Sequence, residues 1–175
     1  MRCVRSALGS LVGGLGGLAF VLGNAGGLPA GWPWPVRALG VLVYLLVLWF
    51  AVVRVWHVSD PVPPAPHALR TYAISVVAML LLFPLGSLLL RRVGYPQLTL
   101  PWVVLVVGAH FLPMARAFRA PVLRAVGLAL GGVAVLGAVL VLTLGPGWPV
   151  SATAVAAGFT LLAAASVGAY RRASG

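Results

Sequence analysis

Six apolar stretches, each about twenty residues long and thus able to cross a bilayer as an α-helix, constrain the fold of this chain most strongly. The chain has 175 residues, and only 7% of them are charged. Soluble domains carry about 25% charged residues. The chain therefore lacks the polar surface that water requires, which excludes a soluble enzyme, a disordered tail and a secreted disulfide scaffold.

The apolar stretches cover residues 7–23, 36–56, 71–90, 98–115, 124–144 and 150–170, and the segments between them are rich in proline and glycine. Backbone polar groups cannot stay unpaired in lipid, so spanning segments are helices or strands of a closed barrel. These stretches are too long for strands and show no alternation of apolar and polar residues. We therefore expect an all-α integral membrane bundle of six transmembrane helices that forms a single domain over residues 1–175.

The arginines predict the orientation of this bundle. The chain has twelve arginines, no lysine and one acidic residue, Asp60. The side that holds both termini would carry nine of them, namely Arg2, Arg5, Arg54, Arg70, Arg116, Arg119, Arg124, Arg171 and Arg172. The other side would carry Arg37, Arg91 and Arg92, with Trp32, Trp34, Trp102 and Trp148 at the helix ends as interfacial anchors. Cytoplasmic loops of membrane proteins carry an excess of arginine and lysine. We therefore expect the side with nine arginines, and with it both termini, to lie in the cytoplasm.

This charge also indicates which partners the chain meets. The arginines stand at the ends of apolar stretches and do not form one basic face, which argues against binding to nucleic acid. They are placed to meet anionic lipid headgroups on the cytoplasmic leaflet. The composition favours a bacterial plasma membrane as the location.

The first apolar stretch has two interpretations. A basic start followed by an apolar run resembles a signal peptide. The row of Gly9, Gly13 and Gly17 instead favours a retained helix that packs closely on another, and Gly127 and Gly131 form a second such pair. These glycines indicate either tight packing within the bundle or contact with a second copy or another membrane protein.

His110 is the candidate for a polar site inside the membrane. It lies six residues before Arg116, which in a helix is about 9 Å below the cytoplasmic interface. Pro113 lacks the N–H that would bond to the carbonyl of Ala109, so a histidine and a freed carbonyl fall within one turn. The hypothesis is a polar pocket for a proton, an ion or a ligand. The alternative is a neutral histidine that braces the helix with one hydrogen bond.

Asp60 is the candidate for an ion pair on the cytoplasmic side. As the single carboxylate, it has Arg70 and Arg116 among its candidate partners. The pair would be either a surface salt bridge or cap of small energetic value, or a latch that gates the cytoplasmic face.

Enzymatic function has little support in this sequence. One carboxylate excludes acid/base chemistry by a pair of carboxylates, and no nucleotide-binding or metalloprotease motif is present. We expect no catalytic residue, no metal and no cofactor. A haem or metal redox protein is the least supported interpretation, because its candidate ligands His57 and His110 would lie at different depths.

The segment GAHFLPMARAF, preceded by Pro101 and Trp102, resembles a G-x-H-F-x-P segment of small bacterial multi-pass membrane proteins of unknown function. The resemblance covers the fourth apolar stretch and the loop after it. It implies a multi-pass membrane protein and supplies neither a substrate nor a catalytic residue.

These observations favour a small non-enzymatic transporter, channel-like protein or lipid-handling protein with a polar pocket near His110. The alternative is a structural or accessory subunit that packs through its glycine- and alanine-rich helix faces, either as a homo-oligomer or on another membrane protein.

Overall fold

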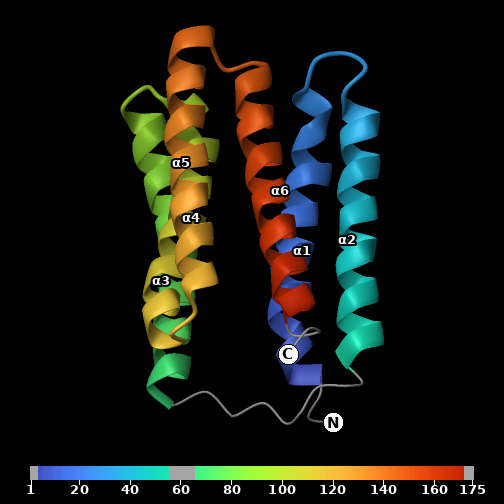
Figure 1. Ribbon diagram of the computed structural model, residues 1–175. Helices are drawn as coiled ribbons and strands as arrows, with labels where there is room; N and C mark the ends of the chain where they lie inside the picture. Colours follow the sequence, from blue (N-terminus) through green and yellow to red (C-terminus); the bar gives the residue numbers. More distant parts are fainter. Residues whose placement is uncertain (1–3, 56–65, 172–175) are drawn as a thin grey trace. The chain divides into compact units, whose positions relative to one another are not determined.

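The computed structural model describes residues 4–55 and 66–171, and nearly all of these residues lie in six long helices (Figure 1). The helices are α1 (Val4–Asn24), α2 (Pro33–Val55), α3 (Pro66–Arg92), α4 (Thr99–Ala117), α5 (Pro121–Leu144) and α6 (Trp148–Arg171). Two short 3₁₀ helices, η1 (Ala25–Gly27) and η2 (Pro96–Leu98), follow α1 and precede α4. Each expected span corresponds to one helix, so the prediction of six apolar helices is confirmed.

All six helices within the described residues are long and apolar enough to cross a membrane. Helix α3 shows most clearly what surface they present, because only 6% of its apolar window is buried. Leu80, Leu85 and Leu89 are among its exposed side chains. An apolar surface of this extent favours lipid over water as its surroundings. The architecture supports a multi-pass α-helical membrane protein.

Proline and glycine mark the beginnings and ends of several helices. Proline is the first residue of α2, α3 and α5, where its missing N–H leaves no helical hydrogen bond unmade. Gly94 and Gly145 follow α3 and α5 with φ of 86° and 89°, a left-handed region that glycine adopts without strain. The helices extend beyond the apolar stretches because proline is tolerated in the first turn of a helix and arginine is favourable in the last turn, as at the two ends of α3.

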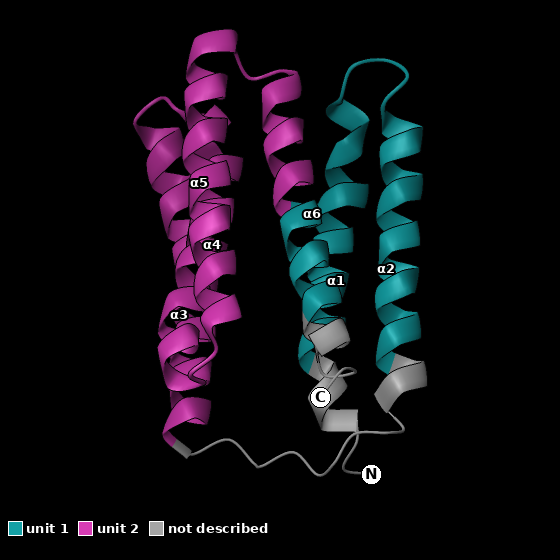
Figure 2. Cartoon of the chain, in the orientation of Figure 1, with its two compact units in different colours: residues 1–63, 158–175 teal, residues 64–157 magenta. Residues whose placement is uncertain are grey.

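The chain divides into two compact units (Figure 2). Unit 1 comprises residues 1–63 and 158–175, and unit 2 comprises residues 64–157, so the division falls within α6. In unit 1, helix α1 contacts α2. In unit 2, helix α4 contacts both α3 and α5.

Unit 1 is held together where helices approach at glycine. A methyl group on Gly17 of α1 would lie 2.6 Å from the carbonyl oxygen of Gly158 of α6, so the two backbones touch there. A methyl group on Gly14 would meet the Tyr44 ring of α2 at 3.1 Å. Gly17 therefore lies at a close contact between two helix backbones. A methyl group on Gly9 or Gly13, the other members of that row, would meet no described atom within 4 Å.

In unit 2, a tight turn joins α4 to α5. The N–H of Ala120 donates to the carbonyl of Ala115 at 3.0 Å, and that of Arg119 donates to the carbonyl of Arg116 at 3.3 Å. This bonding pattern is a Schellman motif, which requires a left-handed residue. Arg119 supplies it with a φ of 50°. The turn brings the end of α4 beside the beginning of α5.

Candidate functional site

Two glycines allow α4 and α5 to cross with their backbones in contact. A methyl group on Gly108 would lie 2.9 Å from the carbonyl oxygen of Gly127, and one on Gly127 would lie 2.8 Å from that of Gly108. A side chain at either position would force the helices apart. Gly127, one of the glycines expected to pack, therefore lies at this crossing.

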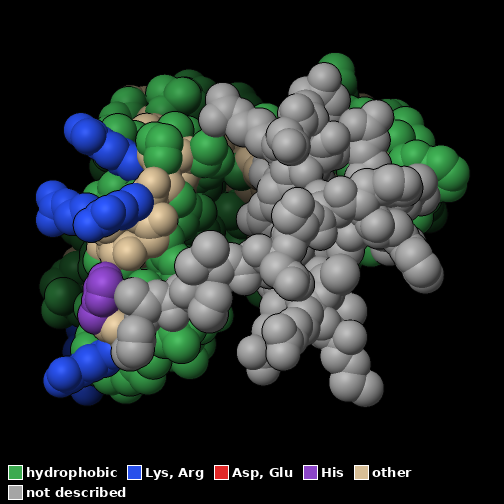
Figure 3. Space-filling model, turned by 60° about the horizontal axis from the view of Figure 1, so that its bottom comes forward, with side chains coloured by type: hydrophobic (Ala, Val, Ile, Leu, Met, Phe, Trp, Pro, Cys, Tyr) green, Lys and Arg blue, Asp and Glu red, His purple; other side chains and the backbone are tan. Residues whose placement is uncertain are grey.

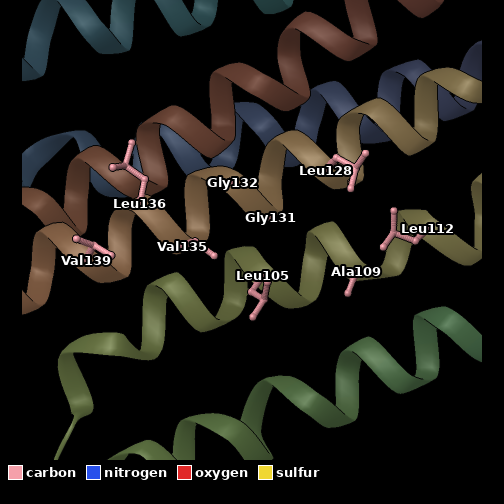
Figure 4. Close-up of a pocket in the computed structure, with 10 residues that line it drawn as sticks. Leu105, Ala109, Leu112, Leu128, Gly131, Gly132, Val135, Leu136 and Val139 are labelled. Atoms are coloured by element: carbon pink, nitrogen blue, oxygen red, sulfur yellow. The ribbon is translucent and has the colours of Figure 1, made fainter.

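An open groove runs along the seam between the same two helices. Its volume is about 640 Å³. Figure 4 shows side chains from both helices along it, with bare backbone at Gly131 and Gly132. Among the described residues, a methyl group on either of these glycines would meet no atom of another helix within 4 Å. The missing side chains leave the seam hollow at this point.

The lining of the groove is apolar along its whole length. It consists of Leu105, Ala109 and Leu112 from α4 and of Gly127, Leu128, Gly131, Gly132, Val135, Leu136 and Val139 from α5. None of these side chains offers a hydrogen-bond donor, an acceptor or a charge. The groove is therefore suited to a hydrocarbon chain and unsuited to a polar solute.

One end of the groove adjoins a cluster of basic side chains. Arg116 follows the lining residue Leu112 by one helical turn, and Arg124 precedes the lining residue Leu128 by one turn. Residues four apart share a helix face and stand about 6 Å apart along the axis. Both arginines are exposed. At the opposite end, the residues one turn beyond Leu105 and Val139 are uncharged.

The basic cluster covers the end of unit 2 where α3 and α5 begin and α4 ends. Figure 3 shows the arginines and a histidine on this face. The exposed members are His67, Arg70, Arg116, Arg119 and Arg124. The chain's single acidic residue, Asp60, lies outside the described residues. Its expected pairing with Arg70 or Arg116 stays a prediction.

His110 lies on the other side of α4, toward α3. Its ring is 6.4 Å from the ring of Tyr72 and 5.4 Å from that of Phe111, both in edge-on geometry. The imidazole also faces the backbone carbonyl of Ser75. Its Nδ1 is buried and has no hydrogen-bond partner among the described residues. The imidazole of His110 either braces α4 against α3 or forms a hydrogen bond through Nδ1 with a bound ligand.

The residues of the expected polar pocket have different surroundings, and the pocket itself stays a prediction. Ala109 lines the apolar groove on the α5 side, whereas His110 contacts residues of α3. Consecutive residues of a helix point about 100° apart, so neighbours in sequence readily face different partners. Pro113 lies within the same helix, half-buried and outside the groove lining.

Both members of the expected glycine pair on α5 line the open groove, and Gly127 also lies at the helix crossing. The groove itself was not foreseen from the sequence. The sequence signal that could have indicated it is the adjacent pair Gly131 and Gly132 within a run of large apolar residues.

Trp102 makes a contact that its expected role as an interfacial anchor did not include. Its Nε1 donates a hydrogen bond of 2.9 Å to the backbone carbonyl of Leu82 on α3. A methyl group on Gly86 would collide with the indole ring, so the absence of a side chain at Gly86 makes room for it. The indole thereby ties the beginning of α4 to the second half of α3.

The described residues contain no group of three or more potential metal ligands. The fold and the groove define the chain as a multi-pass helical membrane protein with an apolar lateral groove. No protein-family model matches the chain. Searches among curated proteins and among solved structures also gave no match.

Proposed function

We propose that the protein is a non-enzymatic, lipid-handling membrane protein that takes an acyl chain into the groove between α4 and α5. The observation that carries this proposal is the apolar groove along the seam of α4 and α5, which the missing side chains of Gly131 and Gly132 leave open. A cavity in a helix seam forfeits van der Waals contacts unless something occupies it. In a bilayer, an acyl chain is the available occupant whose chemistry matches the lining.

The other transport hypotheses have weaker support. A polar solute or an ion would find no partner along the groove, because the lining residues carry no polar side chain. A proton or ion site at His110 is favoured by its unpartnered Nδ1 alone. A lipid-handling role uses both the groove and the basic cluster beside it.

The proposal includes the orientation that the arginines predict, with both termini in the cytoplasm and the chain in a bacterial plasma membrane. The basic cluster would then face the cytoplasmic leaflet, whose anionic lipids attract arginine. The resemblance of the GAHFLP segment to small bacterial multi-pass membrane proteins is compatible with this placement.

Native mass spectrometry of gently extracted protein tests the function. We expect the wild-type chain to retain lipid and Gly131→Leu to lose it, because the leucine side chain would fill the groove. Gly16→Leu is the matched control, since Gly16 also lies within a helix with no described atom within 4 Å of a methyl position. Equal retention by both variants, or no lipid on the wild type, would overturn the proposal.

An accessory role is the second candidate, and the open face at Gly9 and Gly13 favours it. A methyl group on either glycine would meet no described atom of another helix within 4 Å, and small residues allow close approach of a partner helix in membranes. A second copy or a partner protein would appear in the same mass spectra. Gly13→Leu should then remove that partner, whereas Gly131→Leu should leave it bound.

A further inference from the structure

The two ends of the groove differ in charge, and an uncharged occupant would gain nothing from this difference. At one end, Arg116 and Arg124 stand one turn from the lining residues Leu112 and Leu128. At the other end, the corresponding positions are Pro101 and Thr143, which carry no charge. Each of the two helices that form the groove thus contributes one guanidinium to the same end. An occupant that matches both parts has an apolar tail and an anionic head.

Arg124 stands at the beginning of a helix with no acidic side chain beside it among the described residues. Arg124 lies in the first turn of α5, and that turn contains no acidic residue. The beginning of a helix carries partial positive charge, so a cation there is unfavourable and an anion favourable. Arg116 adds a second cation from the last turn of α4. Among the described residues, no carboxylate offsets this charge.

The chemistry of arginine selects the kind of anion. A guanidinium presents N–H donors in a planar fork that matches the oxygens of a phosphate. In a phospholipid, the phosphate is joined through glycerol to the acyl chains. A phosphate bound at the two arginines would therefore place an acyl chain of the same lipid at the groove. A zwitterionic headgroup would bring a cation into the basic cluster, where Arg70 and Arg119 are also exposed.

We propose that the occupant of the groove is a phospholipid of net negative charge, with its phosphate between Arg116 and Arg124 and one acyl chain along α4 and α5. This inference rests on the proposed lipid-handling function and specifies its ligand. It differs from diffuse attraction of the basic face to a membrane, because it assigns headgroup selection to two arginines beside the groove.

The test compares retention of two lipids with identical acyl chains, phosphatidylglycerol and phosphatidylcholine. Full-length protein in detergent is supplied with an equimolar mixture, and native mass spectrometry counts the lipids that stay bound. We expect wild-type protein to prefer phosphatidylglycerol. Arg116→Gln and Arg124→Gln should each lower that preference about tenfold, as expected for loss of a charged hydrogen bond.

Arg70→Gln is the matched control, because it removes one exposed charge from the same basic cluster without adjoining the groove. It should leave the preference nearly unchanged. A paired Arg116→Lys and Arg124→Lys variant keeps the charge and removes the fork, and it should bind phosphatidylglycerol more weakly than wild type. Melting temperatures of all variants would show whether each one folds.

The outcomes separate the ligand from the function. Equal retention of the two lipids by wild-type protein would overturn the proposal that the ligand is an anionic phospholipid. It would leave the proposed lipid-handling function intact. A loss with Arg70→Gln as large as that with Arg116→Gln would also overturn it, in favour of diffuse attraction. Absence of any bound lipid would overturn both proposals.

Discussion

Several hydroxyl side chains among the described residues donate hydrogen bonds within their own helices. Ser87, Thr143 and Thr153 donate to carbonyls four residues earlier, at Phe83, Val139 and Pro149. In lipid this arrangement leaves no donor exposed. Trp102 acts differently, because its indole N–H reaches a carbonyl of the neighbouring helix α3. At the scale of single residues, this indole is a specific link between helices of unit 2.

Replacement of Trp102 by phenylalanine tests that link. The Trp102→Phe variant keeps an aromatic ring and loses the donor to the Leu82 carbonyl, so unfolding free energy should fall by about 1 kcal/mol. Thermal unfolding in detergent, followed by circular dichroism, measures the change. Trp148→Phe is the control, because Trp148 is an exposed tryptophan at another helix beginning. If the two variants have the same melting temperature, the hydrogen bond from Trp102 contributes no stability.

At the scale of elements, α4 meets a different partner on each side. Toward α5 it presents Gly108 at the crossing and then an apolar face along the groove. Toward α3 it presents His110, with Trp102 at its beginning. One helix thus combines a close contact, a hollow and a polar contact. The hollow lies beside the crossing because Gly131 and Gly132 stand one turn beyond the contact residue Gly127.

A pair of alanine substitutions distinguishes the contact from the hollow. Gly108→Ala puts a methyl group against the Gly127 backbone, which cannot rotate away, and should destabilise unit 2 by about 1–3 kcal/mol. Gly131→Ala puts a methyl group into open space and should be neutral or slightly stabilising, since alanine favours helix. Melting temperatures of the two variants in the same detergent give the comparison. Equal melting temperatures would contradict the backbone contact at Gly108.

At the scale of the whole molecule, six membrane crossings would place both termini on the same side of a membrane. An even number of crossings requires this, and the excess of arginine on that side predicts that it is the cytoplasm. The turns at Gly31, Gly94 and Gly145 would then lie outside, and the turn at Arg119 inside.

Reporter fusions test this orientation. Green fluorescent protein should fluoresce at either terminus, and alkaline phosphatase should be active at the Gly31, Gly94 and Gly145 turns and inactive at Arg119. Phosphatase activity at Arg119 would contradict the predicted orientation. An intact mass of 18.1 kDa would show that the first helix is retained, whereas a shorter chain would support the signal-peptide alternative.

The helices and the basic end could be predicted from the sequence, because both follow from local composition. A run of apolar residues must pair its backbone internally wherever it enters lipid, and arginines mark the ends of such runs. The expected span at residues 124–144 accordingly corresponds to α5 (Pro121–Leu144). The glycines were recognised as sites of close packing, and Gly17 and Gly127 have that role.

The sequence by itself determined how many helices form and where the charge lies, since these depend only on neighbours along the chain. Only the tertiary structure decided that a methyl group on Gly127 would meet the backbone of α4 while one on Gly131 would point into open space, and that Ala109 and His110 face different helices. Helices that are apolar on every side carry no strong pattern to predict their rotation about their own axes. That rotation is decided by how the surfaces of neighbouring helices fit together.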